Sequence, residues 1–338
     1  MPGKIVPSDY FPIHVHSEFS CLDGMGGVDA IVKKAADDGR SAISLTDHGT
    51  MAGTLRLYTE AKKHGLAAYP GCEFYLVMDV DDKVLKNNRY HMGMLALDYK
   101  GFRGMTRLSS RSHQRDRFHR KPLIDFDDLA AFSVLYGDNV AITTGCYFGI
   151  VVQTLRESGP AAADMIVDML ASMFRHVSVE VQHHGIPHGR NELSEDEVNK
   201  YLFGVARRKG LPILLGQDSH YCDAEDQPVH DLMKDICYFG DGEDNRFPGG
   251  PYHMATVEEL KVPWSAKRWA LIEEGHAQLL DLHALTMPAL DKYKFHVPKV
   301  SKNADREFSR LVVDGWEQLA ASGVVDQSKE DRYSDQIA

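Results

Sequence analysis

FPIHVHSEFSCLDG, residues 11–24, begins with an apolar run in which two histidines alternate with a valine. Alternate residues of a strand point to the same face, so His14 and His16 would present two imidazoles side by side, as a shared metal requires. Pairs of histidines also occur in satisfied cores and on surfaces. The end of a strand is nevertheless a common place for metal ligands. Other apolar runs of this chain also end in residues that can bind metal.

The first two thirds of the chain alternate short apolar runs with amphipathic helical stretches, a pattern typical of parallel strands linked by crossover helices. We therefore predict the α/β class and a TIM-like (β/α) barrel, in which side chains at the carboxyl ends of the strands meet at one mouth. The seven expected strands cover residues 11–16, 42–46, 67–77, 91–97, 140–144, 176–182 and 212–217. Helices are expected over residues 28–38, 51–64, 161–174 and 195–209.

Beyond about residue 223 the alternation of strands and helices fades, and residues 240–252 are predicted to form a long irregular loop. The remaining chain is expected to be rich in helices, at residues 258–260, 266–274, 276–282 and 307–321, with an extended link at 293–298.

The composition is that of an ordinary globular protein, with 43% hydrophobic and 26% charged residues in 338. No apolar run is long enough to span a bilayer, and the Met-Pro-Gly-Lys terminus lacks the pattern of a signal peptide. The five cysteines include no CxxC pair, which argues against a disulfide framework or a zinc ribbon. These observations predict a cytoplasmic protein with reduced thiols and no membrane partner.

The net charge of −11 argues against a chain that coats nucleic acid by bulk electrostatics, so any DNA contact must be local. The best local candidate is the basic segment 107–121, which also holds an aromatic residue, as a phosphate-backbone contact needs. Its candidate DNA-binding residues are Arg111, Arg115, Arg117, Arg120 and Lys121. The alternative is an ordinary solvated surface, which is the commoner role of a charge run.

Metal-capable side chains also follow other expected strands, namely Asp47 with His48, Cys146, and Asp218 with His220, and Glu73 lies within the strand expected at 67–77. Such a mixed set of imidazoles and carboxylates is too large for one tetrahedral zinc, so two or three divalent ions are implied. Paired ions in phosphoesterases lie about 3.5–4 Å apart, activate water at neutral pH and stabilise charge on the attacking and leaving oxygens. Imidazoles favour zinc, with manganese or iron as alternatives, over magnesium. His91 is an exception, because it begins its apolar run instead of ending it.

These motifs resemble the polymerase-and-histidinol-phosphatase (PHP) domain, in the form found at the amino terminus of the alpha subunit of bacterial replicative DNA polymerases of the polymerase III type. The motifs that carry the resemblance stand in family order: HVHSEFSCLDG (14–24), SLTDHGTMAG (44–53), YPGCEFYL (69–76), RLSS (107–110), TTGCYFG (143–149), VEVQHHGIP (179–187) and GQDSHY (216–221). The resemblance implies a distorted seven-stranded barrel with nine catalytic metal ligands, at His14, His16, Asp23, His48, Glu73, His91, Cys146, Asp218 and His220. Asp23 and Cys146 come from the resemblance alone, since one otherwise reads as a turn residue and the other as a small buried residue.

The resemblance further implies a PHP phosphoesterase domain at residues 1–285 and a helical extension at 286–338 that resembles the start of a polymerase region. Family members with an intact ligand set are metal-dependent 3′–5′ exonucleases that proofread, so the expected partners are a DNA 3′ end and the remainder of the polymerase or other replisome subunits. The closely spaced palm aspartates of the polymerase are absent from this chain, so no polymerase active site is expected in it.

Two other functions stay open on the sequence. One is a stand-alone phosphomonoesterase of the histidinol-phosphate type. The other is a catalytically silent scaffold, because a bound metal can contribute folding free energy without catalysis.

Overall fold

The computed structural model describes residues 8–82, 84, 88–187, 193–238, 247–288, 299, 301–324, 326, 329 and 332. The chain divides into two compact units, Met1–Met287 and Pro288–Ala338. The expected link at 293–298, and most of the loop expected at 240–252, lie outside the described residues. No helix within the described ranges is both long and apolar enough to cross a membrane.

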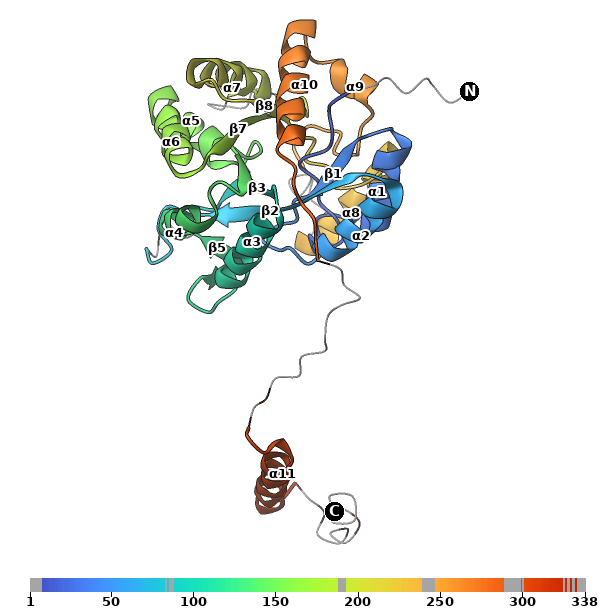
Figure 1. Ribbon diagram of the computed structural model, residues 1–338, viewed down its shortest axis with the longest axis vertical. Helices are drawn as coiled ribbons and strands as arrows, with labels where there is room; N and C mark the ends of the chain where they lie inside the picture. Colours follow the sequence, from blue (N-terminus) through green and yellow to red (C-terminus); the bar gives the residue numbers. More distant parts are fainter. Residues whose placement is uncertain are drawn as a thin grey trace. The chain divides into compact units, whose positions relative to one another are not determined.

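The first unit is an α/β fold built on a curled, mixed sheet with helices around it (Figure 1). The strand order is β4-β5-β2-β3-β6-β7-β8, with β1 paired to β2 beside this path. The strands are β1 (Ala42–Leu45), β2 (Ala67–Leu76), β3 (Tyr90–Ala96), β4 (Phe118–His119), β5 (Lys121–Ile124), β6 (Val140–Thr143), β7 (His176–Val181) and β8 (Ile213–Leu215). Six of the seven expected strands are therefore confirmed as strands.

The seventh expected strand, residues 11–16, is not a continuous strand, but it closes the ring. On one side, Pro12 O and Val15 O accept hydrogen bonds from Ser44 and Thr46. On the other side, the backbone around His16 exchanges two hydrogen bonds with Ser219, just beyond β8. We call residues 12–16 the closing segment. With β1, β2, β3, β6, β7 and β8 it makes a distorted barrel of seven members.

The prediction that all strands run parallel is wrong for β3. This strand pairs antiparallel with both of its barrel neighbours, β2 and β6. The beginning of β3 therefore lies at the end of the barrel where its neighbours carry their polar residues, and Tyr75 of β2 pairs with His91. This reversal explains why His91 begins its apolar run, whereas His48, Cys146, Asp218 and His220 follow theirs.

The short hairpin of β4 and β5 was not expected from the sequence. It extends the sheet at one edge, where β5 pairs parallel with the end of β2. Each strand is too short to produce a readable alternation, and the basic residues around it predict a surface loop.

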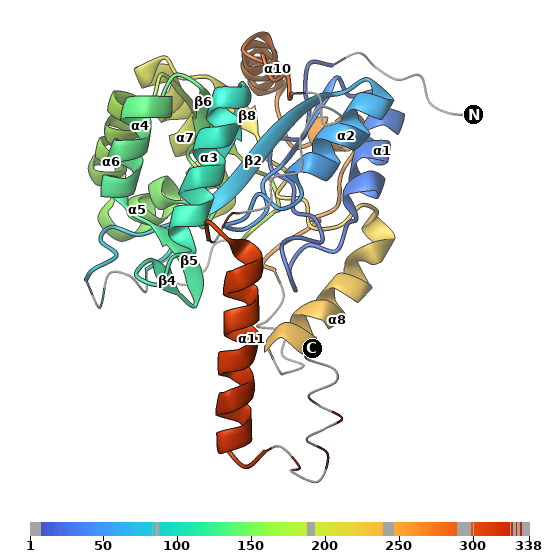
Figure 2. The same cartoon turned by 60° about the horizontal axis from the view of Figure 1, so that its bottom comes forward.

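Eleven α-helices occur in the described residues, and those of the first unit lie around the strands (Figures 1 and 2). They are α1 (Val28–Asp37), α2 (Thr54–His64), α3 (Tyr99–Ser112), α4 (Phe126–Tyr136), α5 (Ile150–Ser158), α6 (Pro160–Met173), α7 (Glu195–Lys209), α8 (Gln227–Tyr238), α9 (Val257–Lys261), α10 (Ala266–Asp281) and α11 (Ala304–Ala321). The predicted helices correspond to α1, α2, α6, α7, α9, α10 and α11, whereas α3, α4, α5 and α8 were not anticipated.

Helix α10 corrects one boundary, because the two helices expected at 266–274 and 276–282 are a single helix. Gly275 lies inside it, where the sequence predicted a break. A Cβ at this position would lie 2.0 Å from the backbone oxygen of Ile213. The glycine therefore permits close packing of α10 on β8 and does not end the helix.

The strands separate two apolar layers by the alternation of their side chains. Phe74, Met92 and Met94 are fully buried in the large cluster between the sheet and the outer helices. Tyr69 and Leu95 belong to a separate cluster that also holds residues of the closing segment and β8. Glu73 and His91 lie at even spacing from Tyr69 and Leu95 along the same strands, so they share the inner face of the barrel.

Candidate metal centre

The inner face of the barrel opens into a cavity of about 590 Å³. Five of the nine proposed ligands line it, namely Asp23, His48, His91, Asp218 and His220. His14, His16 and Glu73 are at most 2% exposed, so they lie beneath these five.

The turn after the closing segment is held by a carboxylate that the sequence placed beside His48. Asp47 accepts hydrogen bonds from the amide and hydroxyl of Ser17, at 2.7 and 2.8 Å, and from the hydroxyl of Ser20, at 2.7 Å. All three partners precede Asp23, so Asp47 fixes the chain between the histidine pair and that residue. Both carboxylate oxygens of Asp47 are therefore occupied by hydrogen bonds from this turn.

Glu73 is the centre of the cluster, and three imidazoles surround its carboxylate. Its oxygens lie 3.2 Å from His14 Nε2, 2.8 Å from His48 Nδ1 and 3.0 Å from His91 Nδ1. The segments that bring these groups together are the closing segment, the turn after β1, and strands β2 and β3.

The remaining proposed ligands join this cluster at its edges. Asp23 Oδ2 lies 2.5 Å from His48 Nε2. Asp218 Oδ1 lies 3.3 Å from His14 Nε2 and 3.2 Å from His16 Nε2. The sulfur of Cys146 lies 3.4 Å from Nδ1 of His91.

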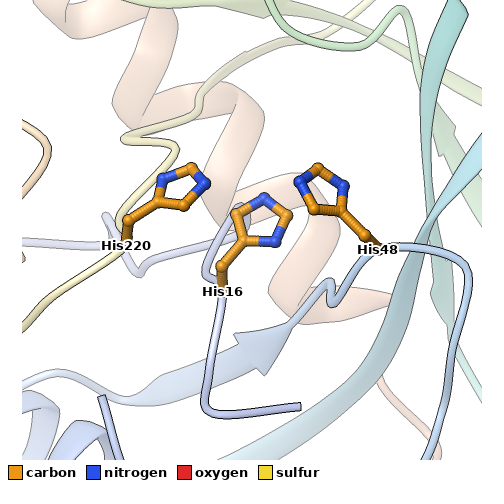
Figure 3. Close-up of side chains that lie close together, drawn as sticks. All are labelled: His16, His48 and His220. Atoms are coloured by element: carbon orange, nitrogen blue, oxygen red, sulfur yellow. The ribbon is translucent and has the colours of Figure 1, made fainter. Parts of the chain in front are cut away.

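His16, His48 and His220 are adjacent although they come from three distant parts of the chain, and Figure 3 shows their rings turned toward one another. The ring of His16 lies between the other two, with centroids 4.3 Å from His48 and 4.4 Å from His220. One nitrogen of each ring lies within 4.8 Å of the others, which would allow the three to share an ion. With these three residues, the structure brings together all nine residues that the resemblance implied.

Hydrogen bonds fix which nitrogen of three imidazoles faces the centre. Nδ1 of His14 donates to Glu180 at 2.6 Å, and Nδ1 of His220 donates to the backbone oxygen of Asp218 at 2.7 Å. The Ser20 hydroxyl donates to Asp47, so it accepts from Nδ1 of His16 at 3.0 Å. Each ring thus keeps its Nε2 for the centre, the arrangement that supporting carboxylates and carbonyls give to metal-binding histidines.

The charges of the cluster depend on burial and on close carboxylates. Burial lowers the pKa of His16 to about 3, and the neighbouring imidazoles of His48 and His220 add to this effect. Burial also opposes protonation of His48, but Glu73 and Asp23 outweigh it and raise the pKa of that imidazole to about 10. Burial raises the pKa of the Cys146 thiol, and the charges of Glu73 and Asp218 add to this effect. Without a nearby cation, this thiol is protonated at neutral pH.

The donor set fits divalent cations. The Nε2 atoms of His14 and His16 lie 3.2 Å apart, a distance that two lone pairs tolerate only with a proton or a cation between them. Both oxygens of Glu73, Nδ1 of His48 and Nε2 of His220 are buried without a hydrogen-bond partner, even though His48 Nδ1 is 2.8 Å from a Glu73 oxygen. Buried polar atoms normally find partners, so a group of them facing one centre matches ligands of an ion.

The five candidate DNA-binding residues are not equivalent in the structure. Lys121 lines the cavity, with its ammonium 5.2 Å from the ring centroid of Tyr75. Arg111 pairs with Asp116, and Arg117 pairs with carboxylates at the start of α4. Arg115 and Arg120 are exposed, before and within the β4–β5 hairpin.

Two further cations line the cavity that sequence reasoning missed, Arg89 and Lys234. Lys234 is only 4% exposed and bonds to Oδ1 of Asp23, while Nε2 of His230 donates to the backbone oxygen of the same residue at 2.9 Å. Helix α8 therefore holds Asp23 by both its side chain and its backbone. The sequence carries no signal for this contact, because a lysine in an amphipathic helix reads as solvated.

The chain is similar to known proteins in sequence. The PHP domain matches residues 12–184. The DNA polymerase III subunit alpha of Borreliella burgdorferi is 31% identical over 233 residues, which cover 67% of this chain and 19% of that protein. The subunit of the same name from Thermus aquaticus is 25% identical over 299 residues, which cover 85% of this chain and 24% of that protein. The chain thus spans between about a fifth and a quarter of the length of these curated relatives.

An error-prone DNA polymerase from Mycobacterium bovis is 32% identical over 216 residues, covering 63% of this chain and 19% of that protein. Among solved structures, one described as a metal-dependent phosphoesterase, from Bifidobacterium adolescentis, aligns with a TM-score of 0.43 and 16% identity. That alignment covers 77% of this chain and 98% of the other.

Proposed function

The chain belongs to the PHP domain family, and from that premise we propose that it is a metal-dependent phosphodiesterase acting on DNA 3′ ends. Its proposed activity is the 3′–5′ exonuclease (proofreading) activity of a bacterial replicative polymerase alpha subunit. The observation that supports this proposal is the convergence of nine metal-capable side chains, between His14 and His220 in the sequence, around the buried carboxylate of Glu73.

Two or three divalent ions, zinc first and manganese or iron as alternatives, would be held by His14, His16, Asp23, His48, Glu73, His91, Cys146, Asp218 and His220. When bound, such ions supply an activated water and stabilise negative charge on the phosphate oxygens. The protein contributes rigid positioning, because Glu180, Ser20 and the Asp218 carbonyl orient three of the imidazoles before any substrate arrives.

The charge of the substrate phosphate would be met by cationic side chains of the same cavity. Arg89, Lys121 and Lys234 approach it from the chain before β3, from β5 and from α8. Figure 2 shows α8 and the β4–β5 hairpin at the same end of the unit. A phosphodiester that enters here would meet positive charge from both, which favours an anionic strand over a neutral substrate.

The experiment uses the full chain, purified with its metals quantified. A primer-template with a 3′ mismatch and histidinol phosphate are offered separately to the wild type, to His16→Ala and to His64→Ala. His64 is an exposed histidine of α2 and serves as the matched control. Release of nucleotides by the wild type and by His64→Ala, with loss in His16→Ala, is the expected result.

The other outcomes contradict the proposal in different ways. Turnover of histidinol phosphate alone would identify a monoesterase. Stoichiometric metal without turnover of either substrate would identify a scaffold of the longer polymerase. A chain that stays free of metal under metal-replete conditions would refute the centre itself.

A further inference from the structure

Two apolar side chains project at the mouth of the cavity, and the chemistry of the metal centre does not use them. Leu22 is 50% exposed and Phe148 is 44% exposed, and both line the cavity. Exposed apolar side chains are common singly on protein surfaces, so exposure alone decides nothing. Their backbone setting and their attachment to the proposed ligands distinguish these two.

Leu22 has a left-handed backbone with φ of 61°. A bulky residue rarely adopts this conformation, and leucine has no polar side-chain atom to compensate for it locally. The exposed side chain gains little from burial, so its identity contributes little to folding. Strain of this kind is retained mainly at functional sites. Among the described residues, Leu22, Arg120 and Asp218 are the non-glycine residues with positive φ, and Leu22 and Asp218 line this cavity.

Both side chains are fixed relative to the proposed ligands. Leu22 precedes Asp23 in a turn closed by hydrogen bonds from Asp23 and Gly24 to the carbonyl of Ser20, each of 2.9 Å. The carbonyl of Phe148 accepts from the backbone amide of His91 at 3.1 Å, and the two rings lie 6.1 Å apart. The apolar surface is therefore carried by the same backbone that carries the ligands.

We propose that Leu22 and Phe148 form a contact surface for the terminal nucleobase of the substrate strand. The cavity then offers apolar contacts for a flat ring, cations for the phosphate and metal ligands for the scissile bond. Stacking on an aromatic side chain is tolerant of base identity, because every base has a π-face. This inference rests on the proposed phosphodiesterase function and specifies its substrate as a nucleotide with an accessible base. An unpaired 3′ base would enter more easily than a paired one, because it has no partner strand to leave.

The test compares two fluorescein-labelled tetranucleotides, one ending in a 3′ thymidine and one ending in a 3′ abasic residue. The ratio of their dissociation constants is measured by anisotropy in EDTA, and the ratio of their cleavage rates is measured with added Mn²⁺. The short length limits contacts away from the end. Wild type is compared with Phe148→Ala, with Leu22→Gly and with Phe308→Ala, which removes an exposed phenylalanine from α11 in the second unit.

The wild type and Phe308→Ala should prefer the thymidine end, and Phe148→Ala should reduce that preference by at least about fivefold, the lower range for loss of a base stack. Leu22→Gly should reduce it too, with a melting temperature equal to or above that of the wild type, because glycine relieves the strained backbone. Equal affinity of the wild type for both ends, or a preference that survives in both variants, would overturn the inference.

Failure of the proposed function gives a different pattern. A wild type that cleaves neither tetranucleotide nor methyl p-nitrophenyl phosphate contradicts the phosphodiesterase proposal. The ratio of dissociation constants in EDTA still tests the base contact in that case.

Discussion

Replacement of Glu180 by alanine tests whether the carboxylate behind His14 positions that ligand. Glu180 is 1% exposed and bonds to His14 Nδ1 and Thr143 Oγ1, both at 2.6 Å, and to Gln182 Nε2 at 3.1 Å. A Cβ at Gly216 would lie 2.1 Å from the carboxylate, so Glu180 is confined on that side too. Without it, His14 can rotate or change tautomer, and its Nε2 is no longer reserved for the centre.

Loss of such a supporting partner typically weakens metal affinity about 10- to 100-fold, or about 1.4–2.7 kcal/mol. The same change leaves the Thr143 hydroxyl and the Gln182 amide without their partner, at about 1–3 kcal/mol of unfolding free energy for each donor that stays unpaired. The affinity for Zn²⁺ is measured by competition with a chromophoric chelator, at a temperature where circular dichroism finds each variant folded.

Glu180→Gln separates positioning from simple structural loss, because its amide oxygen can still accept from His14 Nδ1 and should restore most of the affinity. Glu157→Ala, which removes an exposed glutamate at the end of α5, is the matched control. A folded Glu180→Ala variant that binds Zn²⁺ within about twofold of the wild type would refute the reasoning, since the positioning effect is at least tenfold.

Further predictions concern protons and packing. Because the pKa of His48 is raised to about 10, this imidazole is protonated at pH 7.5, and metal binding must release its proton. Calorimetric titration with metal, in buffers of different ionisation enthalpy, should detect release of about one proton or more. Binding heats that do not depend on the buffer would contradict this prediction. Burial, with the charge of Arg40, lowers the pKa of His276 to about 3 in the folded chain. Between about pH 6.5 and pH 3 this imidazole is therefore protonated in the unfolded chain but neutral in the folded chain. Stability should therefore fall as pH drops from 6.5 toward 3, by up to about 1.4 kcal/mol per pH unit, and His276→Gln in EDTA should lose this share of the slope in urea titrations. Phe74→Ala should lower the unfolding free energy by about 3–5 kcal/mol in denaturant titrations, whereas Phe308→Ala, 69% exposed, should change it by less than about 0.5 kcal/mol.

The sequence predicted the barrel well because its strands are buried apolar runs separated by amphipathic helices. An apolar run does not encode its direction, however, so the reversal of β3 was invisible in the periodicity. The position of His91 at the start of its run was the available cue. A ligand at the beginning of one strand can join ligands at the ends of others only if that strand runs the opposite way. The β4–β5 hairpin escaped prediction because its strands are too short to show a periodic pattern. Helix α8 is amphipathic, but it lies beyond residue 223, where the alternation of strands and helices fades.

Some ligands of the candidate site were predictable from local sequence patterns, and others were not. The His14–His16 alternation and Asp218 with His220 followed from strand geometry, whereas Asp23 and Cys146 depended on family resemblance. The contact between Lys234 and Asp23 joins residues 211 positions apart, and it depends on the placement of α8. Local sequence patterns hold no information on a contact between residues so far apart in the chain, so this supporting lysine was harder to find than the ligands.

The closing segment both completes the barrel and carries two of the candidate metal ligands, so the local stability of the fold and the integrity of the centre depend on the same residues. It is held by a few hydrogen bonds on each side, not by a continuous ladder, so it is a natural place for local opening. The same five residues carry His14 and His16, and therefore any fluctuation that opens the ring also dismantles the centre. A ligand that binds only the closed form adds its binding free energy to the cost of that opening. Amide hydrogen exchange around residues 14–16 and 219 should thus slow on addition of metal. The effect should be larger there than in the paired strands β2 and β3. Binding of metal to the centre would in this way also keep the barrel closed.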